Sequence, residues 1–350
     1  MTTAPRPTPA TSGDEQMMRL VAELYYLRDQ SQSAIADLTG YSISKVSRLL
    51  AQAREVGIVR ISVQAAPEQL SGLAERLAEG LGVEDAHVTP GRSDAPSIAS
   101  RLCAVAAAPW VEGTVPDAGV LGIAGGFTVS ALVDAFPPAR RGHLTVVPLV
   151  GGFDPGAPHL DINEVTRRAA ERLGAHYLVL HAPARVDSPA VRDALMRESS
   201  ILATTEYWSR LSLAIIGISG GPLAHPGYWT VMDRLTPEDR GRLLDNHVVG
   251  DIVGHLFTED GALVEDPSTD QTIAAPVETL RHAARVIAVA AGPHKVAGII
   301  GASRTGLLDS LVTDEPTALA ILERLAAGPR RRPRGTRSAR EVARGRPSGS

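Results

Sequence analysis

The chain has 350 residues and a formal net charge of −4, so it is long enough for two domains and does not coat nucleic acid by bulk positive charge. Its single cysteine, Cys103, excludes an internal disulfide and a cysteine-rich zinc site, which favours a reduced, cytoplasmic location. The N-terminus lacks a signal-peptide pattern and no apolar run reaches the length of about 18 residues that a membrane span needs, so neither export nor insertion is expected.

The first helices of the chain are predicted by apolar spacing. Residues 1–13 are rich in proline and threonine and are expected to be disordered, whereas apolar residues from Asp14 to Arg28 recur at helical spacing. The stretch from Ser31 to Val56 predicts two short helices around Gly40, because glycine adopts the left-handed conformation of a helix end without strain. The residues expected to face inward are Ala34, Ile35 and Leu38 in the first helix of this pair and Val46, Leu49 and Leu50 in the second.

This pair has the spacing of a helix-turn-helix, with small Ala36 where the helices approach each other. Ser31 and Ser42 stand where their hydroxyls can cap the two helices. The second helix presents short hydroxyls beside long cations, a face that suits base edges and phosphates in a major groove. The alternative is a helical hairpin within some core. The residues predicted to contact DNA are Ser31, Gln32, Ser42, Ser44, Lys45, Ser47, Arg48 and Arg54.

A wing is predicted directly after the helices. Gly57 is expected to end the second helix, and the alternation from Ile58 to Val63 predicts a short strand. A winged helix-turn-helix domain would therefore cover residues 14–63. Its positive and negative charges nearly cancel, so a single copy would bind DNA weakly and several joined copies are expected.

The rest of the chain alternates strands and helices. After a connector at 64–69, Leu70–Leu81 is predicted as a helix and Asp85–Thr89 as a strand. Four later apolar runs end in glycine and precede helical segments, which predicts a buried parallel sheet with right-handed crossovers. Residues 70–328 are therefore expected to form a Rossmann-like α/β domain that binds a small molecule at the carboxyl edge of its sheet. The four runs are Gly119–Ile123, Leu144–Val150, Leu211–Ile218 and Val286–Ala290.

The C-terminal tail, residues 329–350, contains eight arginines and one glutamate among prolines, glycines and serines and is expected to be disordered. Two interpretations stay open for it. It would grip DNA phosphates as an auxiliary arm, or it is a solvated terminus without a role.

Seven motifs follow one another in order along the chain. They are LYYLRDQSQSAIADLTGYSISKVSRLLAQAREVGIVRISV at 24–63, GIAGGFTVSALV at 122–133, VVPLVGG at 146–152, APARVDSPAVRDAL at 182–195, VGDIVGHLFTEDG at 249–261, AAGPHKVAGII at 290–300 and LVTDEPTA at 311–318. With this ordered set the chain resembles the SorC/DeoR-type sugar-binding transcriptional regulators. The resemblance implies a large domain similar to sugar-phosphate isomerases and deaminases, which binds a phosphorylated sugar and alters the binding of operator DNA. It also implies assembly into homotetramers or into dimers that pair on DNA.

The effector site is expected at the glycine-rich loops. The loop from Gly122 to Thr128 follows a strand and opens a helix that Thr128 or Ser130 could cap, so its amides suit a phosphate. Tight strand–helix packing is the alternative for these glycines. The resemblance implies that Lys295 binds the effector phosphate and Asp251 a sugar hydroxyl, with Asp161 and Asn163 close by. The predicted effector-binding residues are Gly125, Gly126, Thr128, Asp161, Asn163, Asp251 and Lys295.

Each of these assignments has a plainer alternative. Lys295 could be an exposed surface lysine, Asp251 could cap a helix of its own segment, and Asp161 could be a helix cap. Two departures from relatives matter as well. Val150 replaces an arginine before paired glycines, and Phe127 replaces a polar residue in the first loop, so a monophosphate or a smaller ligand is favoured over a bisphosphate.

Two rival functions are weighed against the regulator. An isomerase-like enzyme would need an acid or base at the carbonyl carbon, for which Asp161, Glu164, Asp251 and Lys295 are the candidates. A DNA-binding scaffold would bind no effector. No cofactor is expected, and a metal site has little support, because no cysteine or HExxH pattern accompanies the scattered His225, His247 and His255.

Overall fold

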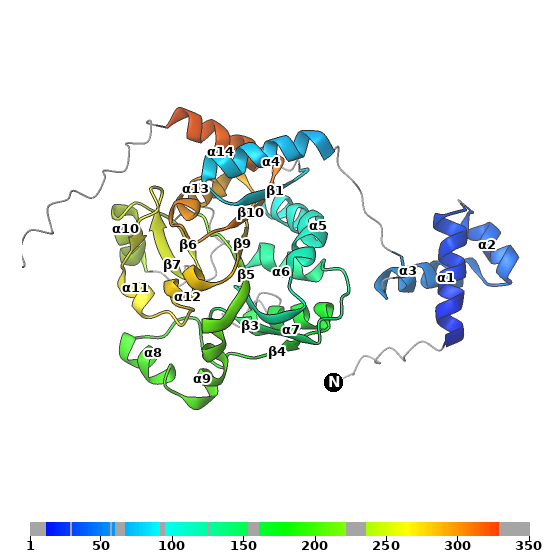
Figure 1. The fold of residues 1–350 in the computed structure, drawn as a ribbon, viewed down its shortest axis with the longest axis horizontal. Coiled ribbons are helices and arrows are strands. Elements are labelled where there is room, and N and C mark those ends of the chain that lie inside the picture. Colours follow the sequence, from blue (N-terminus) through cyan, green and yellow to red (C-terminus); the bar gives the residue numbers. More distant parts are fainter. Residues whose placement is uncertain are drawn as a thin grey trace, which may run out of the picture.

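The computed structural model describes residues 12–28, 30–56, 58–59, 67–91, 95–124, 126–152, 161–221 and 236–328. Three helices of the N-terminal region, α1 (Ser12–Tyr26), α2 (Gln32–Thr39) and α3 (Ile43–Glu55), form a bundle (Figure 1). They bury a hydrophobic core of their own, distinct from that of the α/β domain. This core contains Met18, Val21, Ala22, Ile35, Ala36, Val46, Leu49, Leu50 and Ala53.

The turn between α2 and α3 confirms the prediction at Gly40, which has a φ of 70°. The inward face predicted for α2 is partly wrong, because Ala34 is exposed and the side chain of Leu38 is 66% exposed. Successive residues of an α-helix are rotated by about 100°. Buried Ile35 and Ala36 therefore define one face, and Ala34 and Leu38 fall on the other.

The predicted wing is only partly covered by the structure. Ile58 and Val59 form no strand and pack against the core of the three helices, where the amide of Val59 donates to the carbonyl of Ala53 at 3.0 Å. Gly57 and residues 60–63 lie outside the described residues. The wing therefore stays a prediction.

A seven-stranded parallel sheet organises the larger domain, in the order β1-β10-β9-β5-β2-β3-β4. The α/β fold expected from the sequence is confirmed, and each strand predicted between residues 70 and 328 is present. In this sheet the sequence did not predict β4, which is short, or β10. The strands are β1 (Asp85–Thr89), β2 (Ala118–Ile123), β3 (His143–Pro148), β4 (His176–Tyr177), β5 (Leu211–Gly217), β9 (Val286–Val289) and β10 (Ser310–Asp314).

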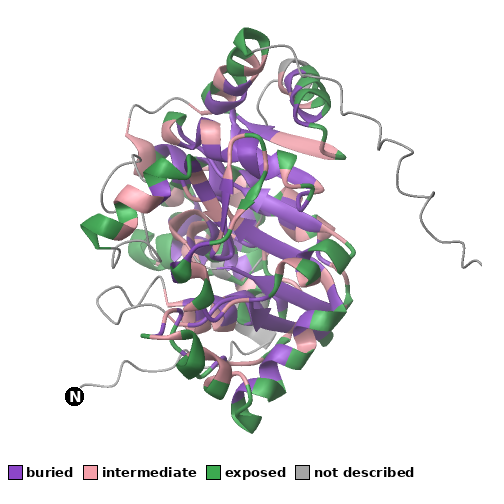
Figure 2. Cartoon of the chain, turned by 90° about the vertical axis from the view of Figure 1, so that its left-hand side faces the viewer, coloured by how far each residue is buried: buried purple, intermediate pink, exposed green. Residues whose placement is uncertain are grey.

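Helices cover both faces of this sheet. Right-handed crossovers place the connections that run toward β4 on one face and those that run toward β1 on the other. Figure 2 shows the sheet as the buried layer and the helices as partly exposed. No described helix is long and apolar enough to span a membrane. One face carries α5 (Pro96–Thr114), α6 (Phe127–Asp134) and α7 (Ile162–Leu173), and the other carries α4 (Pro67–Leu81), α13 (Val296–Arg304) and α14 (Glu315–Ala327).

A small antiparallel sheet follows β5 in the chain and packs on α13. The contact is close because α13 carries glycines: a Cβ atom at Gly298 would lie 3.3 Å from the carbonyl oxygen of Val249, and one at Gly301 would lie 2.6 Å from that of Thr258. The sheet contains β6 (Val248–Ile252), β7 (His255–Thr258) and β8 (Leu263–Val264). The remaining elements are α8 (Pro189–Leu195), α9 (Ser199–Thr205), η2 (Glu206–Arg210), α10 (Pro237–Asp245), α11 (Pro267–Asp270), α12 (Val277–His282) and η4 (Pro293–Lys295).

Candidate functional site

The two serines that flank the turn cap their helices. The hydroxyl of Ser31 accepts a hydrogen bond from the amide of Ala34 at 3.2 Å, and that of Ser42 accepts one from the amide of Lys45 at 3.2 Å. Each cap satisfies an amide that the first helical turn leaves without a partner. The caps fix where α3 begins and therefore which side chains it presents. The prediction that these serines contact DNA stays open beside this structural role.

Helix α3 presents one polar face to solvent. Val46, Leu49 and Leu50 are buried, which confirms the predicted apolar stripe. The opposite side of the helix carries Ser44, Lys45, Ser47 and Arg48, with Arg54 in the last turn, and all five side chains are exposed. Gln32 on α2 is half-buried. A capped helix with an exposed arc of hydroxyls and cations has the form of a recognition helix.

Tyr41, in the turn before α3, was not predicted as a functional residue. The ammonium of Lys45 lies over its ring, 3.7 Å from the centroid. Lys45 is the third residue of α3, where the positive end of the helix dipole disfavours a cation, and the negative face of the ring offsets this repulsion. The signal that would have found the contact is an aromatic residue four positions before the lysine.

The loop after β2 leads directly into α6. Gly126 is the N-cap of α6 and has a φ of 130°, a conformation that favours glycine. The expectation that Thr128 or Ser130 caps this helix is wrong, because both residues lie inside α6 and no side chain caps it. Half-buried Thr128 belongs to its first turn. Gly125 lies outside the described residues, so its predicted role has no structural counterpart here.

Lys295 is a buried cation at the carboxyl end of β9. Its side chain is only 9% exposed, and its ammonium donates a hydrogen bond of 2.7 Å to the carbonyl of Ile218 at the end of β5. The alternative of an exposed surface lysine is therefore wrong. Burial lowers the pKa of Lys295 to about 8, and the negative charge of Asp251 acts in the opposite direction.

Asp251 lies in strand β6, so the alternative of a helix cap in its own segment is wrong. The carboxylate accepts a hydrogen bond of 3.1 Å from the amide of Gly254, in the turn between β6 and β7. The backbone amide of Asp251 donates to the hydroxyl of Ser219 at 2.7 Å. The β6–β7 turn is thereby held beside the carboxyl end of β5, and Asp251 contributes negative charge near Lys295.

Asp161 and Asn163 lie at the start of α7, but they differ in which side-chain atoms are already engaged in hydrogen bonds. One carboxylate oxygen of Asp161 caps α7 by accepting a hydrogen bond from the amide of Glu164 at 3.1 Å. The other oxygen faces Gly152 and lies 3.3 Å from the position that a Cβ atom on Gly152 would take. The amide group of Asn163 is engaged at both ends by the backbone of Leu180, at 2.9 and 3.2 Å. Asp161 therefore retains an oxygen toward the paired glycines, whereas Asn163 fixes the neighbouring segment.

The predicted effector residues gather at one edge of the sheet. β9, β5, β2 and β3 are neighbours, and the segments that follow them in the chain start from their carboxyl ends. Lys295 follows β9, Gly126 follows β2 and Asp161 follows β3, while Asp251 joins them through the contact with Ser219 after β5. Open α/β sheets bind ligands at this edge. The geometry supports a small-molecule site there.

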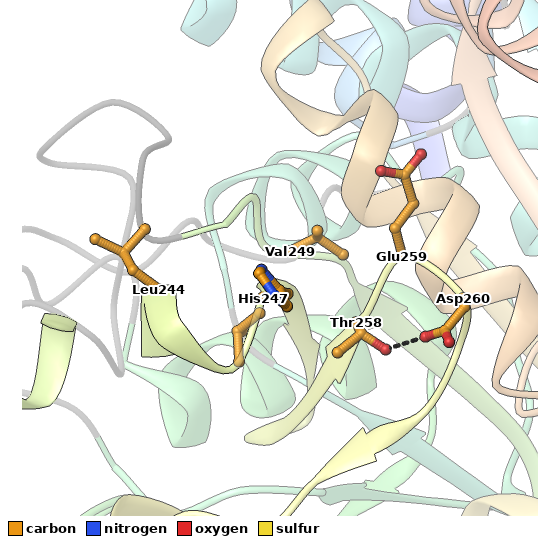
Figure 3. Close-up of a pocket in the computed structure, with 7 residues that line it drawn as sticks. Leu244, His247, Val249, Thr258, Glu259 and Asp260 are labelled. Atoms are coloured by element: carbon orange, nitrogen blue, oxygen red, sulfur yellow. Dashed lines mark hydrogen bonds between the residues drawn. The ribbon is translucent and has the colours of Figure 1, made fainter. Parts of the chain in front are cut away.

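A separate cavity of about 520 Å³ lies at the other end of the β6–β7 hairpin (Figure 3). Val248 pairs with Thr258 at the open end of this hairpin, whereas Asp251 is beside its turn. Two hydrogen bonds of 2.7 Å from Arg324 lower the pKa of the lining Glu259, and Asp260 accepts from the hydroxyl of Thr258. Two carboxylates at its wall disfavour a phosphate. The cavity is therefore distinct from the predicted effector site.

The histidines give no metal site in the part of the chain that the structure describes, where no three potential ligands come together. One ring nitrogen of His255 lies 2.8 Å from the carbonyl oxygen of Ala275, and His247 is exposed. His225 lies outside the described residues.

Comparison with known proteins extends these findings to nearly the whole chain. Residues 66–323 match the sequence family described as "Putative sugar-binding domain". The sorbitol operon regulator of Klebsiella pneumoniae is 29% identical over 316 residues, which are 89% of this chain and 99% of that protein. The deoxyribonucleoside regulator of Bacillus subtilis strain 168 is 28% identical over 319 residues, 89% of this chain and 98% of that protein.

The fold agrees with the sequence. The crystal structure of the full-length sorbitol operon regulator from Klebsiella pneumoniae superimposes with a TM-score of 0.71 at 28% identity, covering 89% of this chain and all of that one. These relatives are regulators of transcription and not enzymes. The family match spans most of the chain, and the chain therefore belongs to the SorC/DeoR family of sugar-binding transcriptional regulators.

Proposed function

We propose that this chain regulates transcription by binding operator DNA through α3, and that a phosphorylated sugar or a related small metabolite in the α/β domain controls this binding. The observation that carries the effector half is the buried ammonium of Lys295 at the carboxyl edge of the sheet. In the described part of the chain the Ile218 carbonyl accepts one of its three N–H donors, which leaves donors for a ligand oxyanion.

The remaining residues of the site are assigned to different chemical groups of the effector. The amides at the start of α6, beside Gly126, suit the phosphate together with Lys295. The carboxylates of Asp251 and Asp161 suit sugar hydroxyls, as acceptors of hydrogen bonds. Thr128 and Asn163 lie in or beside the loops that form this site. Gly125 is assigned to the same phosphate-binding loop as Gly126.

Tight binding of operator DNA would need more than one copy of the chain. One α3 offers only a few cations, so a homotetramer, or dimers that pair on DNA, would place several recognition helices on one operator in the cytoplasm. An effector that binds one arrangement of the large domains better than another would shift their population. The spacing of the paired recognition helices, and with it operator affinity, would change.

The effector half is tested with labelled operator DNA, taken from the region upstream of the gene, and a panel of sugars with and without phosphate. Fluorescence anisotropy should show that at least one sugar phosphate changes operator affinity. Lys295→Met should remove this response and leave effector-free DNA binding unchanged, while Arg281→Gln, which removes an exposed cation of α12, should keep it. A panel without any response in anisotropy or calorimetry would instead support the scaffold without an effector.

The DNA half is tested by Lys45→Ala combined with Arg48→Ala. Both side chains are exposed, so the fold and effector binding should persist while operator affinity falls on the order of 100-fold or more. Calorimetry with the active sugar checks that the large domain is intact. Operator affinity that survives this double change would show that α3 is not the reading helix.

A further inference from the structure

Arg185 lies between two of the segments that form the candidate effector site. The segment that contains Arg185 follows β4 and lies beside the paired glycines after β3. Gly152 forms a β-bridge with Pro183, and the amide of Ala184 donates to the carbonyl of Gly152 at 2.7 Å. On its other side the segment pairs with residues 271–273, where Arg185 is directly opposite Thr272. Arg185 is thus built into a short ladder at the same end of the domain as Asp161.

The direction of the Arg185 side chain follows from this pairing. Residues directly opposite each other in an antiparallel ladder project to the same side. The methyl group of Thr272 lies 2.9 Å from the position that a Cβ atom on Gly254 would take. Gly254 is in the β6–β7 turn, and its amide donates to the carboxylate of Asp251. Arg185 therefore leaves the ladder on the side of the β6–β7 turn.

The guanidinium of Arg185 is incompletely satisfied. Its Nε and Nη2 donate to one neutral acceptor, the amide oxygen of Gln271, at 3.3 and 3.1 Å. Its Nη1 is buried and has no hydrogen-bond partner among the residues that the structure describes. Within the same described residues, the hydroxyl of Thr269, two residues before Gln271, is likewise buried without a partner. A buried donor on a full positive charge is costly unless an acceptor meets it, and an anion satisfies it best.

We propose that Arg185 binds an oxyanion of the effector, with Gln271 holding the guanidinium in place and Thr269 offering a second hydrogen bond. This inference rests on the proposed function, because it adds a residue to the same site. An oxyanion on the effector is either a phosphate or a carboxylate, and both match the planar donors of arginine. Arg185 would then contact the oxyanion of the effector from the segment that follows β4.

The test is calorimetry on the full chain with inorganic phosphate in one arm and acetate in the other. The native protein should bind one of the two, which identifies the oxyanion. Arg185→Gln should weaken that binding by about 10-fold or more, the range of a hydrogen bond to a charged group. Arg185→Lys should recover part of it, and Thr269→Val should weaken it less. The matched control is Arg281→Gln, which removes one positive charge from an exposed helix and should bind as the native protein does.

Three results would overturn the proposal. The native chain binds neither anion, Arg185→Gln binds as tightly as the native chain, or Arg281→Gln loses as much affinity as Arg185→Gln. A purely packing role for Arg185 would appear as a lower melting temperature with unchanged anion binding, which also overturns it. Lys295→Met in the same titration separates this inference from the proposed function: if that variant loses the anion and Arg185→Gln keeps it, only the assignment of Arg185 fails.

Discussion

Lys295 links the stability of the domain to pH. The pKa of its side chain falls from 10.5 to about 8 on folding, so the unfolded chain binds the proton more tightly. Below pH 8 the folded state bears the full cost of the buried charge, about 3 kcal/mol for a shift of this size. As pH rises from 8 toward 10.5 the folded state loses the proton first, and this cost disappears.

Lys295→Met should therefore stabilise the protein at neutral pH. The substitution keeps most of the side-chain volume and removes the buried charge, so the free energy of unfolding should rise by up to about 3 kcal/mol at pH 7. The difference from the native chain should shrink toward pH 10. Urea denaturation at both pH values measures it. A gain that is equal at both values, or a loss at pH 7, would contradict the burial of a charged lysine.

The ring of Tyr41 holds the ammonium of Lys45 at the start of α3, the proposed recognition helix. Tyr41→Leu keeps an apolar side chain against the three-helix core but removes the aromatic face, so operator affinity should fall about two- to five-fold. Tyr41→Phe, which keeps the ring, should bind as the native chain does. The same leucine change in a Lys45→Ala background should cost almost nothing further, because the two residues act as a pair. Equal losses in both backgrounds would show that Tyr41 acts without Lys45.

At the scale of elements, the β2–α6 junction depends on one backbone conformation. Gly126 has φ 130° and ψ 158°, a region that other residues enter only with strain. Gly126→Ala should therefore cost about 1–3 kcal/mol of stability and displace the first turn of α6. Chemical denaturation measures the cost, and effector titration should show a weaker response. Gly113→Ala, at a helical position with open space around it, is the control and should cost little. A response of normal strength in Gly126→Ala would separate this turn from effector binding.

The elements also show what the sequence predicted. Long apolar runs predicted β2, β3, β5 and β9 because strands buried on both faces need no polar alternation. The run into β10 was missed, since Ser310–Asp314 passes directly into α14 without a glycine. The β6–β7 hairpin was missed because Val253 and Gly254 form its turn, with φ values of 52° and 81°, and valine is not a turn residue.

For the candidate site, the sequence predicted where the residues lie in the fold but not which residues they contact. Lys295, Asp251 and Asp161 were expected at the carboxyl edge and lie near it. Their partners could not be inferred, because Ile218 is 77 positions from Lys295 and Ser219 is 32 from Asp251. The engagement of Asn163 by Leu180 depends in the same way on how α7 packs, which spacing along the chain does not encode.

At the scale of the whole molecule, the two lysines of this chain fall in its two proposed functional regions. Every other basic side chain is arginine or histidine, so Lys45 on α3 and Lys295 in the proposed effector site are the only lysines among 350 residues. A protein labelled with ¹³C at lysine Cε therefore gives one signal for each end of the proposed switch.

Operator DNA should shift the Lys45 signal, because a phosphate or a base edge replaces solvent around its ammonium. An active sugar phosphate should shift the Lys295 signal. With operator at half-saturation, the same sugar should also move the Lys45 signal toward its free or its bound position, since the two sites bias one equilibrium. In the Lys295→Met variant, the Lys45 signal should still shift on adding operator DNA and should no longer shift on adding the sugar. A sugar that shifts Lys295 and leaves the half-saturated Lys45 signal in place would show that the two domains bind their ligands independently.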